Sequence, residues 1–117
     1  MASARRDIDI EQNATFAKRF FIVNKADGSP FDLTAYDLGG EAQVRESAIS
    51  AVVLASFTVD IPSPATSGEV RYSMSAADAA SIPVGVKSWD LFLLSTTLGR
   101  WRVLRGDARV HPTVTRP

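Results

Sequence analysis

The run from Val86 to Leu94 constrains the fold more than any other part of the sequence. Its side chains alternate with the period of two expected of a strand, and one of its two faces is wholly apolar. The apolar face carries Trp89, Leu91 and Leu93, and the half-apolar face carries Ser88, Asp90, Phe92 and Leu94. Because both faces contain large apolar groups, the pattern predicts a central strand that is covered on both sides.

Other short segments show the same alternation, separated by turns. In residues 69–74 the side chains of Val70, Tyr72 and Met74 are expected to point inward, and in residues 40–45 Ala42 and Val44 are expected inward, with Glu41, Gln43 and Arg45 outward. Seven or eight such strands with turn signals between them predict an all-β protein, an antiparallel β-sandwich of immunoglobulin-like size. We place this domain at residues 7–111, between a flexible arm at 1–6 and a tail at 112–117.

One helix and two interruptions are also predicted. Ser75 can cap an alanine-rich helix over residues 75–82, which Pro83 would end. In residues 15–23, Lys18 falls on the same face as Phe16 and Phe20, which predicts a β-bulge near Lys18. Gly106 and Asp107 are expected to separate a strand at residues 100–105 from a last short strand at 108–111.

The composition narrows the classes of function. The 117 residues contain thirteen basic and thirteen acidic side chains, and this balance argues against broad attraction to nucleic acid or anionic lipid. The absence of cysteine excludes disulfides and thiolate chemistry. No apolar run approaches the roughly 18 residues of a membrane span, and we expect no signal peptide.

Few residues suggest catalysis or metal binding. The single histidine, His111, lies near the C-terminus and is poorly placed for a Ser-His-Asp site or for zinc. Asp7, Asp9 and Glu11 could supply oxygen ligands to calcium, but alternate acids on a strand are more typical of a solvated face. Paired carboxylates in a sugar-cleaving cleft would need a longer insertion than the chain offers. We therefore predict no catalytic residue, metal, cofactor or small-molecule substrate.

The densest basic feature is the set Arg100, Arg102 and Arg105, interleaved with Trp101. Such a pattern can bind single-stranded nucleic acid, but it is more often the outward face of an edge strand, and the zero net charge favours the latter. Trp101 or Tyr36, if exposed, could instead form a stacking platform for a sugar.

The order of several motifs resembles a known group of proteins. These motifs are DIDIEQNATF at residues 7–16, DGSPFDLTAY at 27–36, QVR at 43–45, and the segments 68–70, 73–85, 89–91 and 104–106, with Val110, Pro112, Val114 and Thr115. Over residues 7–116 the chain resembles small virion proteins of tailed bacteriophages, in particular the immunoglobulin-like N-terminal modules of baseplate and receptor-binding proteins. Ala35 departs from the glycine that such sequences often carry.

This resemblance implies a structural role in the virion, as a tail, baseplate or fibre-joining component made in the host cytoplasm and present in several copies. The expected partners are other virion proteins, with no nucleic acid or membrane. The candidate assembly contacts are Arg5, Arg6, Ile8, Ile10, Arg100, Trp101 and Arg102. Residues 7–10 would offer an edge for strand addition. The alternatives are a capsid decoration or head-completion protein, and a carbohydrate-binding module for host-surface adhesion.

Overall fold

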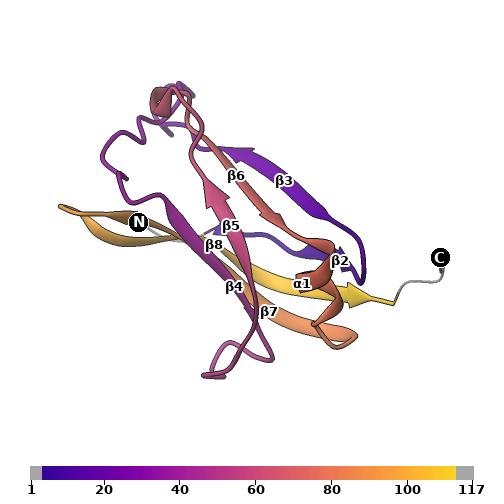
Figure 1. The fold of residues 1–117 in the computed structure, drawn as a ribbon. Helices are drawn as coiled ribbons and strands as arrows, with labels where there is room; N and C mark the ends of the chain where they lie inside the picture. Colours follow the sequence, from indigo (N-terminus) through magenta and orange to yellow (C-terminus); the bar gives the residue numbers. More distant parts are fainter. Residues whose placement is uncertain (1–3, 113–117) are drawn as a thin grey trace.

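The computed structural model describes residues 4–112, and within them the regular secondary structure is almost entirely β-strand (Figure 1). In chain order the elements are β1 (Ala4–Arg5), β2 (Ile8–Glu11), β3 (Phe16–Phe21), β4 (Gly40–Arg45), β5 (Val53–Asp60), the 3₁₀ turn η1 (Ala65–Ser67), β6 (Glu69–Met74), α1 (Ala76–Ala80), β7 (Gly85–Ser95) and β8 (Gly99–His111). The all-β prediction is therefore confirmed. The helix is confirmed as well, since the Ser75 hydroxyl accepts a hydrogen bond from the Asp78 amide at the start of α1.

The strands form one sheet in the order β1-β8-β7-β4-β5-β6-β3, with β2 also paired to β8. The sheet curls, so that β3 and β6 face the layer of β4, β7 and β8 across the core, while β5 pairs with strands of both layers (Figure 1). The pairings of β1 and β2 with β8 are parallel and the others are antiparallel. The expectation of an entirely antiparallel arrangement was wrong at the N-terminus.

The strand β7 lies inside the sheet, between β8 and β4, as predicted. The expected cover on both of its faces is wrong, because Ser88, Asp90, Phe92 and Leu94 on the second face are only half-buried and no second layer of the described chain packs on them. Trp89, Leu91 and Leu93 are all at most 3% exposed, and they share the core with Val70, Tyr72 and Met74 of β6. The Trp89 ring stacks on the Tyr72 ring with centroids 5.4 Å apart, which joins the two layers of the curled sheet. The predicted interior of the domain is confirmed for these six side chains.

The N-terminal segment is part of the sheet and not an arm. Ala4 and Arg5 pair with β8, and the carbonyl of Arg6 accepts a hydrogen bond from Trp89 Nε1 at 2.8 Å. The prediction of a flexible arm is therefore wrong for residues 4–6, because the backbone there lies within hydrogen-bonding distance of the central layer. Residues 1–3 of the predicted arm, and 113–117 of the predicted tail, lie outside the described residues.

The predicted bulge near Lys18 does not occur. The pairing of β3 with β6 runs without interruption from Phe16 to Phe21, and Lys18 is exposed between the buried Phe16 and Phe20. Since β3 is the last strand of the sheet, the long Lys18 side chain can reach solvent past the open edge. An inward-pointing lysine on an edge strand also discourages unspecific pairing with another chain.

The strand β8 continues through Gly106 and Asp107, so the predicted break was wrong. Its register with β7 shifts elsewhere, where Leu91 pairs with Leu104 and Phe92 pairs with Arg102, leaving Val103 as an extra residue. Both Val103 and Leu104 are consequently buried, although they are adjacent in sequence. Beyond this irregularity, each side chain of β8 points to the face opposite to the one that strict alternation would give it.

Candidate functional site

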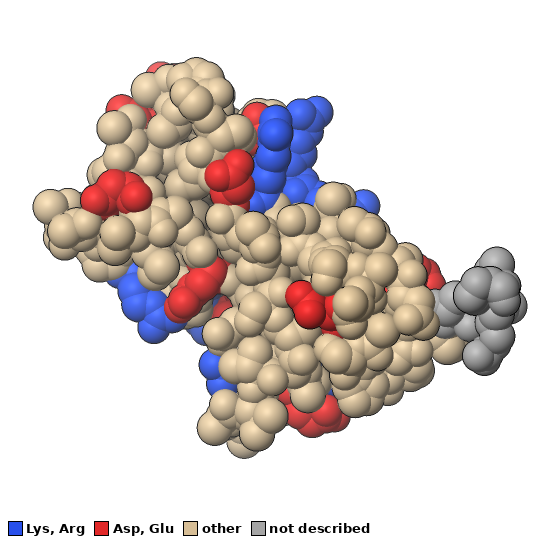
Figure 2. Space-filling model, viewed as in Figure 1, with Lys and Arg blue, Asp and Glu red and all other residues tan. Residues whose placement is uncertain are grey.

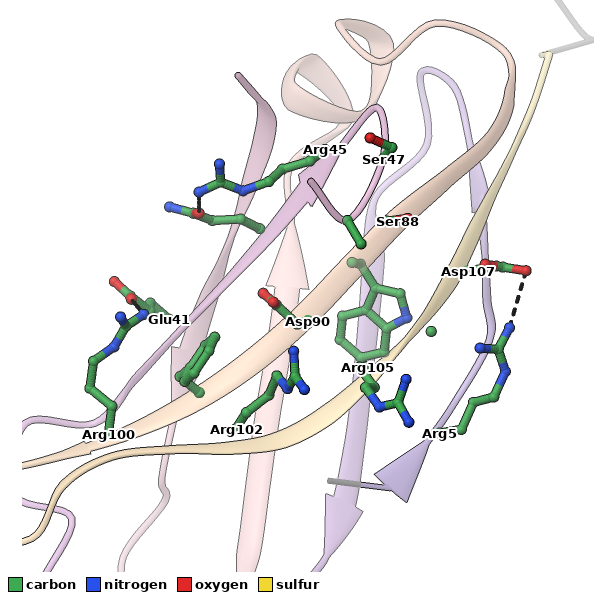
Figure 3. A pocket seen from close by; sticks show the side chains of 15 residues that line it. Arg5, Glu41, Arg45, Ser47, Ser88, Asp90, Arg100, Arg102, Arg105 and Asp107 are labelled. Atoms are coloured by element: carbon green, nitrogen blue, oxygen red, sulfur yellow. Dashed lines mark hydrogen bonds and ion pairs between the residues drawn. The ribbon is translucent and has the colours of Figure 1, made fainter. Parts of the chain in front are cut away.

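The outward face of β4, β7 and β8 is hollowed into a groove of about 510 Å³ (Figure 3). Five arginines and three acidic side chains line it, together with Phe92 and small polar residues. The arginines are Arg5, Arg45, Arg100, Arg102 and Arg105, and the acids are Glu41, Asp90 and Asp107. Five arginines thus gather on one face of the sheet, although the whole chain has no net charge. The face shown in Figure 2 is mainly uncharged, with acidic side chains spread over it and a group of basic side chains at the upper right.

The pairing of β8 with β7 places three arginines of the groove in one row. Arg100 lies opposite Leu94, Arg102 opposite Phe92, and Arg105 opposite Asp90. These are successive outward positions of β7, two residues apart. Strict alternation along β8 would put Arg105 on the other face from Arg102, so it is the extra residue Val103 that brings the third arginine into the same row.

Two of the arginines are held by neighbours within the face. Arg100 forms an ion pair with Glu41 at 2.6 Å, and its guanidinium lies 4.2 Å from the centre of the Phe92 ring. Arg45 donates hydrogen bonds to Gln43 Oε1 at 2.7 Å and to the Ser50 carbonyl at 2.9 Å. These contacts fix the orientation of both side chains before any partner arrives.

A further arginine reaches the groove from the edge strand β1. Arg5 forms ion pairs with Asp7 and with Asp107, both at 3.2 Å. The Asp7 carboxylate also accepts a hydrogen bond from the Asp107 amide, and this bond lowers the pKa of Asp7. The N-terminal segment thus forms one wall of the groove.

Arg102 and Asp90 stand in the middle of the groove (Figure 3). Within residues 4–112, Arg102 forms no hydrogen bond and no ion pair shorter than 4 Å, so its donors are available. Burial raises the pKa of the Asp90 carboxyl, an effect that the positive charge of Arg102 opposes. The centre of the groove therefore combines an unpaired guanidinium with a carboxyl that is incompletely stabilised.

One end of the groove adjoins an apolar loop, residues 46–52 between β4 and β5. Ser47 and Ala48 line the groove, while Ile49 is 95% and Val52 65% exposed. Val53, the first residue of β5, is also exposed and pairs with Arg45. Three large apolar side chains are thus exposed within five residues of this part of the chain.

The structure places the seven predicted assembly contacts in very different environments. Arg100 and Arg102 lie in the groove and Arg5 lies at its margin, whereas Arg6 contributes its carbonyl to the Trp89 hydrogen bond. Ile8 and Ile10 are buried in the core, so their side chains cannot contact a partner unless the fold opens. Trp101 is half-buried.

Trp101 packs against Phe31 and Tyr36, with ring centroids 5.8 and 5.7 Å away. Tyr36 itself is buried. Neither ring is therefore presented as an open platform on which a sugar could stack.

Sequence reasoning found the arginines of β8 but did not assemble the groove. Arg45 and Glu41 were expected to face outward from β4, and this prediction is confirmed. It is the one signal in the sequence that could have located the side of the groove formed by β4. The wall formed by Arg5 required the parallel pairing of β1 with β8, for which the sequence has no local signature.

His111 lies 2.9 Å from Asp9 at the exposed surface. No cluster of three or more possible metal-binding side chains occurs between residues 4 and 112. Over the same residues, no helix is long and apolar enough to cross a membrane.

Comparison with models of known protein families finds no match to this chain, and comparison with curated proteins finds none. Its function must therefore be inferred from the site itself and from the resemblance of its motifs.

Proposed function

We propose that this chain is a structural protein of a bacteriophage virion, a tail, baseplate or fibre-joining component that assembles in several copies. In this proposal the curled sheet is an immunoglobulin-like sandwich that acts as a rigid module between other virion proteins. The motif resemblance over residues 7–116 supports this assignment, as does the exposed apolar loop beside the arginine-lined groove.

The observation that carries the proposal is the apolar loop between β4 and β5. A hydrophobic side chain as exposed as Ile49 gains several tenths to a few kcal/mol when a partner covers it, at roughly 25 cal/mol per Å² of apolar area. Val52 and Val53 extend the same loop. An exposed apolar cluster rimmed by polar residues is typical of a protein–protein contact.

The loop is restrained by contacts within it and with the neighbouring strands. Arg45 donates to the Ser50 carbonyl, the Ser50 hydroxyl accepts a hydrogen bond from the Val52 amide, and Lys87 forms an ion pair with Glu46 at 2.8 Å. Because the loop is already restrained, little conformational entropy is lost when it docks. This favours use of the loop as a preformed contact.

The proposal can be tested by replacing Ile49 with aspartate in the phage that encodes the chain. We expect Ile49→Asp to leave the isolated protein folded, with its stability changed by no more than about 0.5 kcal/mol. We also expect a loss of at least ten-fold in the amount of protein found in purified particles by immunoblotting. The matched control is Leu98→Asp, which places the same charge on an exposed leucine of the β7–β8 turn.

Normal incorporation of Ile49→Asp would eliminate the loop as the contact. Absence of the unsubstituted chain from purified particles would eliminate the virion role altogether.

A further inference from the structure

We infer that the arginine-lined groove binds an extended acidic segment of a neighbouring virion protein, with carboxylates at every second residue. This inference rests on the proposed function for the identity of the partner. The groove itself defines the chemistry of the segment, through its charge, the spacing of its arginines and its position beside the apolar loop.

The charge of the groove is positive, with five arginines against three acids. Arg100 and Arg45 are oriented by the contacts described above, and Arg102 has no partner at hydrogen-bonding or ion-pairing distance in the described chain. Arginine binds a carboxylate through two parallel hydrogen bonds, so an unpaired guanidinium between oriented ones is suited to carboxylates.

The spacing of the arginines favours an extended peptide. Arg100, Arg102 and Arg105 stand opposite Leu94, Phe92 and Asp90, which are alternate residues of β7 and therefore about 6.6 Å apart from one to the next. Side chains on one face of an extended peptide repeat at the same distance. A segment lying along β8 could thus present one carboxylate to each arginine.

The residues of this chain that directly follow β8 do not fit the role of this segment. Residues 113–117, which follow β8, contain one arginine and no acid, so they lack the charge that the groove requires. The groove volume of about 510 Å³ lies within the roughly 300–1,000 Å³ that is typical of ligand sites. The adjoining Ile49 and Val52 would favour an apolar residue at one end of the segment.

The test measures binding to the isolated, full-length chain by fluorescence anisotropy at low and high salt. The probe is a labelled six-residue peptide with glutamate at every second position. Comparison peptides carry glutamine in place of glutamate, or three adjacent glutamates with the same charge. An oligogalacturonate represents an acidic polysaccharide. We expect saturable binding of the alternating peptide, at least ten-fold tighter than either comparison peptide and weakened by salt.

Two variants locate the binding site. Arg102→Gln should weaken the alternating peptide at least about ten-fold, since charged hydrogen bonds are lost. Arg109→Gln removes an exposed arginine of the same strand outside the groove, and should weaken binding of the alternating peptide less than two-fold. In the unsubstituted protein, the peptide should shift the backbone amide NMR signals of Asp90, Phe92 and Arg102.

Several results would overturn the inference: no saturable binding, equal binding of the comparison peptides, or equal weakening by the two variants. Tighter, Arg102-dependent binding of oligogalacturonate would assign the groove to a polysaccharide instead. This assay uses the isolated chain, so its result is independent of the particle experiment. The peptide can fail to bind the groove while Ile49 is still needed for incorporation into particles, and peptide binding can be found although Ile49 is not needed.

Discussion

Gly106 shows how a single residue decides where the N-terminal segment lies. It stands opposite Trp89, and a methyl group at this position would collide with the carbonyl of Arg6, the group that accepts the Trp89 hydrogen bond. A glycine therefore allows the edge strand to approach the sheet closely, in a place where its sequence neighbours suggest a break.

We expect Gly106→Ala to lower the free energy of unfolding by about 1–3 kcal/mol, because the backbone at Arg6 must move away. Thermal and urea unfolding would measure this loss. Gly28→Ala serves as a comparison, since a methyl group there meets no atom within 4 Å and only the positive φ of 72° opposes it. If the two variants lost equal stability, close approach of the chain would not be the reason for Gly106.

Asp90 makes the stability of the folded protein depend on pH. Burial raises the pKa of this carboxyl in the folded protein, so the folded state holds the proton more tightly than the unfolded state does. Stability is therefore lost as the pH rises from the ordinary aspartate value through the raised folded pKa. The charged groups that act on Asp90 are Arg45, Arg100, Arg102 and Glu41.

Asp90→Asn should consequently be more stable than the unsubstituted protein at pH 7, and this advantage should shrink as the pH falls towards 3. Urea unfolding at a series of pH values measures both curves. An advantage that is independent of pH, or a less stable variant at pH 7, would contradict the assignment of burial as the dominant cause.

At the scale of elements, the N-terminal strands are structural and not a detachable joint. Ile8 and Ile10 are 6% and 0% exposed, and each buried isoleucine side chain contributes about 1.5–3 kcal/mol. Removal of residues 1–10 also eliminates the Arg6 carbonyl that receives the Trp89 hydrogen bond. Burial removes the two side chains as contacts, whereas strand addition at residues 7–10 stays a prediction, since β2 pairs only with β8 among the described strands.

We expect a chain that lacks residues 1–10 to lose at least about 3–6 kcal/mol of stability, a large part of the 5–15 kcal/mol typical of a domain. Circular dichroism melting would show a much lower transition or none. A truncated chain that melts like the full one would restore the N-terminus as a separable arm.

The elements that could be predicted are those whose pattern is local. The alternation in β7 and β6 identified the core, and Ser75 with Pro83 identified α1. The shift at Val103, the continuity of β8 and the parallel pairing of β1 depend on which strands lie beside them. For this reason the basic residues of β8 were visible in the sequence, while the groove that they share with β1 and β4 was not.

At the scale of the whole molecule, the two features that we propose for docking, the apolar loop and the arginine-lined groove, adjoin each other. Both lie at or beside the outward face of the layer formed by β4, β7 and β8. The opposite layer, with the inward-pointing Lys18 at its open edge, is poorly suited to uncontrolled strand addition. The module would therefore bind its neighbours mainly through one face.

The most direct measurement is an image of the intact virion of the encoding phage, at a resolution that traces this chain. We predict several copies at the tail or baseplate, each with Ile49 covered by a neighbour and an acidic segment along Arg100, Arg102 and Arg105. Copies on the capsid surface would select the head-decoration alternative. Particles without the chain, or with this face in solvent in every copy, would contradict the account.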